Sequence, residues 1–240
     1  MCVYCGEQRK LTADHVPPKL LFAQPYPTNL ITVPACRSCN ASFQKDDEYT
    51  RTVISLDVRA SKNLDVQLKL PAILRSLKKP NARAFAEYLA SQTAASAVVA
   101  PDGAPMGQIV NVDRARVNAT GARIIRGLYF VEMGRPLTPN AVMRVEARGG
   151  PLRPDEADAR TIAHAYCKFS EHRDGAIGTA FSYAAGFGDG MSVWIMLLYD
   201  YFLWVGTVDA RSAPDGGLGL HDAAVTLKKA ETGKNSVRNS

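Results

Sequence analysis

The sequence has no run of about eighteen apolar residues, the length that a membrane-spanning helix requires. Its longest mainly apolar stretch, residues 191–208, is interrupted by Ser192, Asp200 and Gly206, and its aromatic and β-branched residues favour buried strands. The first residues also lack the basic region and the apolar core of a secretory signal. We therefore expect no membrane partner and a reducing compartment, the cytoplasm.

Cysteine is scarce, at five of 240 residues, and a reducing compartment favours thiols or metal ligands over disulfides. Four of the cysteines form two Cys-x-x-Cys pairs, Cys2 with Cys5 and Cys36 with Cys39. Two intervening residues let both sulfurs of a pair face one ion, and two pairs complete a closed tetrahedral site. We therefore predict a structural Zn²⁺, with a redox-active pair as the alternative. Cys167 is predicted to be a small core residue.

The net charge is modest, because 29 Lys and Arg stand against 23 Asp and Glu, for +6. Residues 1–60 carry seven basic and six acidic side chains, residues 61–160 carry fifteen and nine, and residues 161–240 carry seven and eight. The +6 excess therefore lies in the middle of the chain. Such an excess favours a polyanionic partner that docks there, and a solvated basic face is the alternative.

Periodicity and turn residues predict a mixed α and β chain with no internal repeat. Gly134 stands where the C-terminal cap of a helix is expected, and Tyr199-Asp200 is short enough for a hairpin turn. Beyond residue 213 the chain has little to bury, so we expect a flexible tail. The expected helices are 39–56, 71–77, 81–96, 118–133 and 154–170, and the expected strands are 30–33, 141–147, 180–187, 192–198 and 201–208.

Polar side chains follow a regular order between and just after the cysteine pairs. Asp14 and His15 are adjacent, Asn29 comes fourteen residues after His15, and Asn40 directly follows the fourth cysteine. This order places a hard oxygen ligand beside a general base. Taken singly, each residue also suits an ordinary role as a turn Asp, a surface His or a helix-cap Asn.

Together with the two cysteine pairs, Asp14-His15, Asn29 and Cys36-x-x-Cys39-Asn40 resemble the HNH endonuclease motif in its four-cysteine, zinc-knuckle form. The stretch of residues 33–49 extends the likeness to a set of prokaryotic HNH proteins of about this length. The motif covers about a quarter of the chain. Residues 124–130 and the strand that begins at Ser192 resemble the downstream region of those proteins.

The resemblance implies a treble-clef ββα fold that grips one divalent cation, Mg²⁺ or Mn²⁺, separate from the zinc. Asp14 and Asn40 would be the ligands of that cation, and His15 would take a proton from the attacking water. Asn29 would tie down the loop and orient His15. The expected activity is hydrolysis of DNA phosphodiester bonds, which leaves 5′-phosphate and 3′-hydroxyl ends.

The fold class expected from these features is α+β. We predict an HNH module at 1–58, a mixed helical domain with a C-terminal antiparallel sheet at 59–212, and the tail at 213–240. Asp47 lies within about 60° of Asn40 on an ideal helix, and we interpret it as part of a solvated acidic face, with an approach to the metal as the alternative. Double-stranded DNA is the expected partner, which implies nucleoid association in the bound state. The candidate contacts to nucleic acid are Lys19, Arg37, Lys45, Lys78, Lys79, Arg123 and Arg126.

Two other functions stay open at this point. One is a catalytically silent zinc module that binds nucleic acid or protein. The other is a defence-system nuclease that its C-terminal domain holds inactive until a signal arrives. The sequence also leaves a homo-oligomer open, and it does not decide between DNA and RNA or between nicking and double-strand cutting.

Overall fold

The computed structural model describes residues 1–95, 108–138, 140–148 and 156–211. Within them the chain has a mixed α+β fold with an antiparallel sheet, as the sequence predicted, and the sheet has five strands, one more than expected. The predicted tail at 213–240 lies outside the described residues, as do the first residues of the helix expected at 154–170.

An antiparallel hairpin followed by two short helices forms the N-terminal part. The strands pair from Leu11 opposite Cys36 to Val16 opposite Ile31. The helix predicted at 39–56 is divided at Phe43, whose ring packs edge-on against Tyr4, with the ring centroids 4.8 Å apart. The elements are β1 (Leu11–Val16), η1 (Lys19–Leu21), β2 (Ile31–Cys36), α1 (Arg37–Ser42) and α2 (Gln44–Ser55).

The middle of the chain is mainly helical, and the helix predicted at 71–77 begins earlier, at Leu64. Asn63 caps the longest helix of this region, because its side chain accepts a hydrogen bond from the Asp65 backbone N–H, so Pro71 lies inside the helix and not at its start. The elements are η2 (Val58–Lys62), α3 (Leu64–Leu77), η3 (Pro80–Ala82), α4 (Arg83–Ser91), β3 (Thr93–Ala95) and β4 (Gln108–Val110).

A long helix, α5 (Arg114–Met133), precedes the sheet and ends at Gly134. Gly134 has a φ of +66°, and its N–H donates to Phe130 O, so the predicted cap is confirmed. The strand order of the sheet is β5-β9-β8-β7-β6, and the turn at Tyr199-Asp200 joins β8 to β9. The elements are β5 (Val142–Ala147), α6 (Glu156–Tyr166), β6 (Glu171–Ile177), β7 (Phe181–Gly188), β8 (Met191–Leu198) and β9 (Phe202–Asp209).

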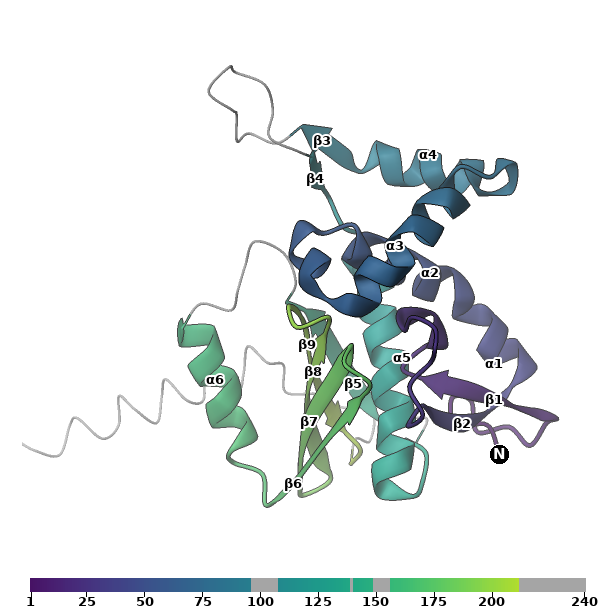
Figure 1. Ribbon diagram of the computed structural model, residues 1–240. Coiled ribbons are helices and arrows are strands. Elements are labelled where there is room, and N and C mark those ends of the chain that lie inside the picture. Colours follow the sequence, from purple (N-terminus) through teal and green to yellow (C-terminus); the bar gives the residue numbers. More distant parts are fainter. Residues whose placement is uncertain (96–107, 139, 149–155, 212–240) are drawn as a thin grey trace, which may run out of the picture.

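Helix α5 lies between the sheet and the N-terminal hairpin (Figure 1). Two glycines allow this close packing: Gly121 lies against Trp204 of β9, and Gly127 lies against Val16 of β1. One hydrophobic cluster therefore includes buried side chains from β1, β2, α2, α5 and the sheet. The core is continuous across the predicted domain boundary at residue 58.

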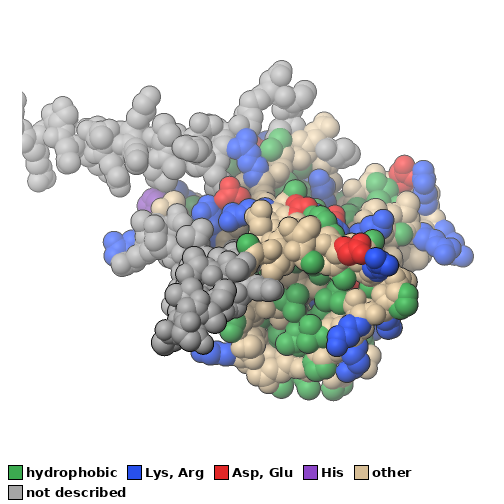
Figure 2. Space-filling view, turned by 90° about the horizontal axis from the view of Figure 1, so that it is seen from above, with side chains coloured by type: hydrophobic (Ala, Val, Ile, Leu, Met, Phe, Trp, Pro, Cys, Tyr) green, Lys and Arg blue, Asp and Glu red, His purple; other side chains and the backbone are tan. Residues whose placement is uncertain are grey.

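The end of the molecule that carries α3 and α4 presents a mixed surface. Seen from above, hydrophobic side chains gather on part of this face, and Lys and Arg side chains lie around its edge (Figure 2). Large apolar side chains exposed on η2 and α3 are Val58, Leu64, Leu68 and Leu74.

Candidate functional site

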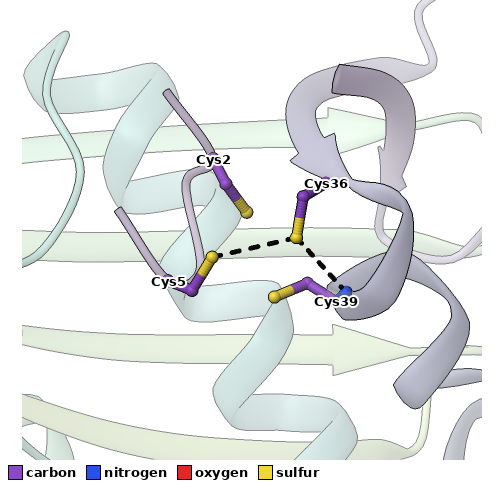
Figure 3. A group of neighbouring side chains, drawn as sticks. All are labelled: Cys2, Cys5, Cys36 and Cys39. Carbon is purple, nitrogen blue, oxygen red and sulfur yellow. Dashed lines mark hydrogen bonds between the residues drawn. The ribbon is translucent and has the colours of Figure 1, made fainter. Parts of the chain in front are cut away.

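The four predicted zinc ligands meet at one point. The Sγ atoms of Cys2, Cys5, Cys36 and Cys39 all lie within 4.8 Å of one another, and Cys5 Sγ is 3.8 Å from Cys36 Sγ (Figure 3). A tetrahedral site with Zn–S bonds of about 2.3 Å has S–S edges of about 3.8 Å, so this spacing suits zinc. The thiolates of this group therefore fit a single structural Zn²⁺.

Local backbone structure explains why each pair can face one ion. At the second pair, the Cys39 N–H donates to Cys36 Sγ over 3.5 Å, and Ser38 Oγ lies 3.1 Å from the same sulfur. Hydrogen bonds from Ser38 and from the Cys39 N–H lower the pKa of the Cys36 thiol, while burial raises the pKa of the Cys39 thiol. A metal requires the thiolate form of its cysteine ligands. At the first pair, Gly6 turns the chain with a φ of +75°, where a side chain would be strained. Cys167 is exposed, so its prediction as a core residue was wrong.

Strand β1 directs its two candidate catalytic side chains to opposite faces. Asp14 is 4% exposed and bonds to α5, and Val16, two residues on, packs against the same helix. Because side chains alternate along a strand, His15 lies on the other face, where it is half-buried. The structure therefore separates the carboxylate from the imidazole beside it in sequence.

Asp14 belongs to a buried ionic cluster that local sequence patterns do not show. Arg123 of α5 donates from Nε to Asp14 Oδ2 over 3.2 Å and from Nη2 to Asp14 Oδ1, and its Nη1 donates to Asp47 Oδ2. The Tyr4 hydroxyl donates to Asp14 Oδ2 over 2.6 Å, and Phe43 lies under the guanidinium, 4.9 Å from ring centroid to Cζ. The Arg123 side chain is 4% exposed.

These contacts decide whether Asp14 fits the divalent cation that the resemblance implies. An ionised carboxylate offers about four lone pairs, and Arg123 and Tyr4 take three of those on Asp14. The remaining lone pair is on Oδ1, the oxygen that Arg123 Nη2 already contacts, so a cation there would face a positive charge. In this arrangement Asp14 does not fit a divalent cation.

Two predictions about this cluster need correction. Arg123 was predicted to contact nucleic acid, but its guanidinium is buried and paired with Asp14 and Asp47, so phosphates do not reach it. Asp47 was interpreted as part of a solvated acidic face, but it is 4% exposed. Burial raises the pKa of Asp47 to about 6, although Arg123 lowers it. Its Oδ1 is buried and has no hydrogen-bond partner among the described residues.

His15 keeps the properties of a proton acceptor. Burial lowers its pKa below the usual value, and the charge of Lys19 lowers it further, while Asp14 raises it. The neutral imidazole, which a general base requires, is therefore favoured. Lys19 is exposed and lies over the Tyr26 ring, with Nζ 4.1 Å from the centroid, and its charge acts on the His15 imidazole.

The two asparagines have different positions. Asn40, on α1, donates from Nδ2 to Thr12 Oγ1 over 3.3 Å, which places it beside β1, two residues from Asp14 along the strand. Asn29 bonds to the β6–β7 turn: its Nδ2 donates to Ala176 O over 2.8 Å, and its Oδ1 accepts from Gly178 N over 3.2 Å. Asn29 therefore links its loop to this turn through both of its polar groups, and the role toward His15 that the resemblance implies stays a prediction.

The other candidate contacts to nucleic acid are accessible to different degrees. Arg126 is half-buried on α5, and burial lowers its pKa. The exposed candidates are Lys19, Arg37 and Lys45 in the N-terminal part, and Lys78 and Lys79 at the end of α3.

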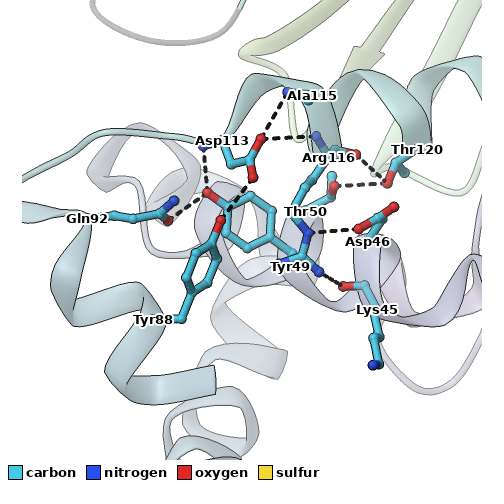
Figure 4. Close-up of polar contacts among 10 residues, drawn as sticks. All are labelled: Lys45, Asp46, Tyr49, Thr50, Tyr88, Gln92, Asp113, Ala115, Arg116 and Thr120. Carbon is cyan, nitrogen blue, oxygen red and sulfur yellow. Dashed lines mark hydrogen bonds and ion pairs between the residues drawn. The ribbon is translucent and has the colours of Figure 1, made fainter. Parts of the chain in front are cut away.

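A second polar network joins α2 to α5 (Figure 4). Arg116 Nε donates to Asp46 Oδ1 over 2.7 Å, and its Nη2 donates to Lys45 O over 2.7 Å. Tyr49 Oη accepts from the Asp113 backbone N–H over 2.7 Å. Arg116 and Arg123 thus neutralise acids of the first sixty residues, so part of the charge excess of residues 61–160 lies at an internal contact and not on the surface.

No helix within the described residues is long and apolar enough to cross a membrane. In comparisons with known proteins, no protein-family model, no curated protein and no solved structure matches the chain.

Proposed function

We propose that this protein is an HNH-type endonuclease whose active module is the zinc-clamped hairpin and helix at residues 1–58. The observation that carries the proposal is the cysteine cluster, whose Sγ atoms lie within 4.8 Å of one another. One bound zinc would join the N-terminal knuckle to the end of β2 and the start of α1. Asp14 and His15 of β1 and Asn40 of α1 are then on adjoining elements of one treble-clef module.

The chemistry proposed is hydrolysis of phosphodiester bonds in DNA, with 5′-phosphate and 3′-hydroxyl products. His15 is the residue that would take the proton from an attacking water, because its neutral form is favoured and it is half-buried beside Lys19. Lys19, Arg37 and Lys45, all exposed, would meet phosphates close to the cut. A bound Mg²⁺ or Mn²⁺ would supply positive charge at phosphorus, but Asp14 in its present pairing does not fit it, so no step is assigned to the cation.

A catalytically silent zinc module is the second candidate, and the Asp14–Arg123 pair favours it. The buried ion pair with Arg123 suits a structural role for Asp14 in place of metal binding. A silent module would bind nucleic acid or protein without cutting. The two candidates predict different results from the same substrates.

The test is cleavage of supercoiled plasmid, linear duplex, single-stranded DNA and RNA with Mg²⁺, Mn²⁺ or EDTA, with the zinc-loaded protein. The proposed nuclease cuts at least one substrate, and His15→Ala lowers the single-turnover rate at least ~10²-fold while zinc content is unchanged. His172→Ala is the matched control, because His172 lies on β6 at the far edge of the sheet. Wild-type cleavage by His15→Ala would reject the assigned base. Binding without cleavage under every condition would favour the silent module.

A further inference from the structure

The buried cluster of Asp14, Asp47 and Arg123 is not balanced in charge. Two carboxylates share one guanidinium, so the ionised cluster carries a net charge of −1. Asp47 Oδ1 is buried and has no hydrogen-bond partner among the described residues. Two carboxylates at such close quarters repel each other unless a cation lies between them. Arg123 is the cation that the structure places there.

Arg123 is held in this position from several sides. Its Nε, Nη1 and Nη2 all donate to the two carboxylates, and the Phe43 ring lies against its guanidinium. The Tyr4 hydroxyl also donates to Asp14, at the oxygen that accepts from Arg123 Nε. The guanidinium belongs to α5, outside the hairpin and helices that carry the two acids, so a part of the chain beyond residue 58 supplies the charge.

We infer that Arg123 is the resident cation of the Asp14–Asp47 pair, and that a divalent cation binds these carboxylates only when the guanidinium is displaced. For the nuclease proposed above, on which this regulatory meaning rests, α5 holds the candidate cation site closed. A movement of α5 away from β1 would expose both carboxylates together. Arg123 is thus a positioning residue that acts through Asp14.

The experiment measures Mn²⁺ binding to the zinc-loaded full chain by electron paramagnetic resonance of free Mn²⁺, with no nucleic acid present. Arg123→Met keeps an unbranched, mainly apolar side chain, shorter than that of arginine, and removes the charge. We expect it to bind Mn²⁺ at least about tenfold more tightly than the wild type, because a unit positive charge has left the site. Arg126→Met, on the same helix, is the matched control and should bind as the wild type does. Addition of Asp14→Asn to Arg123→Met should remove the gain.

Two results would overturn the inference. The first is a folded Arg123→Met protein whose Mn²⁺ affinity equals that of the wild type. The second uses only the wild type and Asp14→Asn, and so does not depend on whether Arg123→Met folds: Mn²⁺ binding by the wild type that Asp14→Asn abolishes would show that Arg123 does not exclude the cation. Neither measurement involves cleavage. The Mn²⁺ result therefore tests the role of Arg123 even if the nuclease assay shows no activity.

Discussion

Replacement of Gly127 by alanine tests the contact that brings α5 against β1. A Cβ atom on Gly127 would lie 2.4 Å from Val16 Cγ2, 2.7 Å from Cγ1 and 3.0 Å from Cβ. Carbon atoms pack best about 3.5–4.0 Å apart, and Val16 is 1% exposed, so rotation of its side chain does not remove the clash. The strand itself must move away from the helix, and Asp14, two residues earlier, moves with it.

The expected magnitude follows from two opposed contributions. Overpacking costs about 1–3 kcal/mol, and the clash with Val16 Cβ, which is fixed to the backbone, places this case near the upper end. Alanine favours a helix over glycine by about 1 kcal/mol. We therefore expect Gly127→Ala to lower the free energy of unfolding by about 2 kcal/mol, or the melting temperature by about 4–8 °C.

The assay is urea denaturation followed by circular dichroism, with Val16→Ala and the double variant measured beside it. Val16→Ala makes room for the added methyl group, so the double variant should be more stable than the sum of the single effects by at least about 0.5 kcal/mol. A Gly127→Ala protein as stable as the wild type, or strictly additive effects, would refute the reasoning. Either result would mean that β1 and α5 are not in the close contact described.

Three further predictions concern the metal, the surface charge and pH. Cys36→Ser should lose the zinc, as measured by atomic emission, and with it the fold of the N-terminal part. Structural zinc contributes about 10–16 kcal/mol to folding in small domains. Cys167→Ser, at an exposed thiol, should keep both the zinc and the fold. Replacement of Lys78 and Lys79 together by alanine should weaken DNA binding equally for unrelated sequences. It should also reduce the salt dependence of the binding constant by up to about two phosphate contacts. If titrations at several salt concentrations show an unchanged salt dependence, the binding surface lies elsewhere. Lys69 is half-buried, with Asp65 and Arg51 as its charged neighbours, and desolvation lowers its pKa from 10.5 to about 7. The unfolded chain therefore holds more protons between pH 7 and 10.5, so stability should rise with pH in that window, and Lys69→Met should flatten the rise in denaturation curves.

The sequence was most informative where a local pattern alone determines the structure. The cysteine spacing predicted a cluster that the structure brings together, because each pair needs only its own short turn. The strands β7, β8 and β9 follow from their apolar content, and the turn at Tyr199-Asp200 has both residues at positive φ, 53° and 64°. Strand β6 was missed because its first residues, Glu171 to Asp174, are polar and exposed at the sheet edge, so its pairing depends on β7.

The sequence was least informative about Arg123, which adjoins the apolar stripe of α5. Its neighbours Ile124 and Ile125 are buried, and the charge of an arginine there suggested the surface. Its partners Asp14 and Asp47 lie 109 and 76 residues away, so no local pattern joins them. For the same reason the sequence predicted Asp14 to be a ligand of a divalent cation and did not show that the Arg123 guanidinium pairs with it.

The separation of Asp14 from Arg123 in the sequence also determines when their ion pair can form during translation. The ribosome makes the hairpin first, but the 109 residues that separate the two partners take roughly 5–20 s to add at usual elongation rates. The hydrogen bond of Asn29 forms later still, because its partner Ala176 lies 147 residues further along the chain. During that interval the nascent hairpin carries Asp14 without its guanidinium. The contacts of the hairpin are thus complete only after residue 178 has been translated, and a protein cut short before α5 would leave both carboxylates of the cluster without their guanidinium.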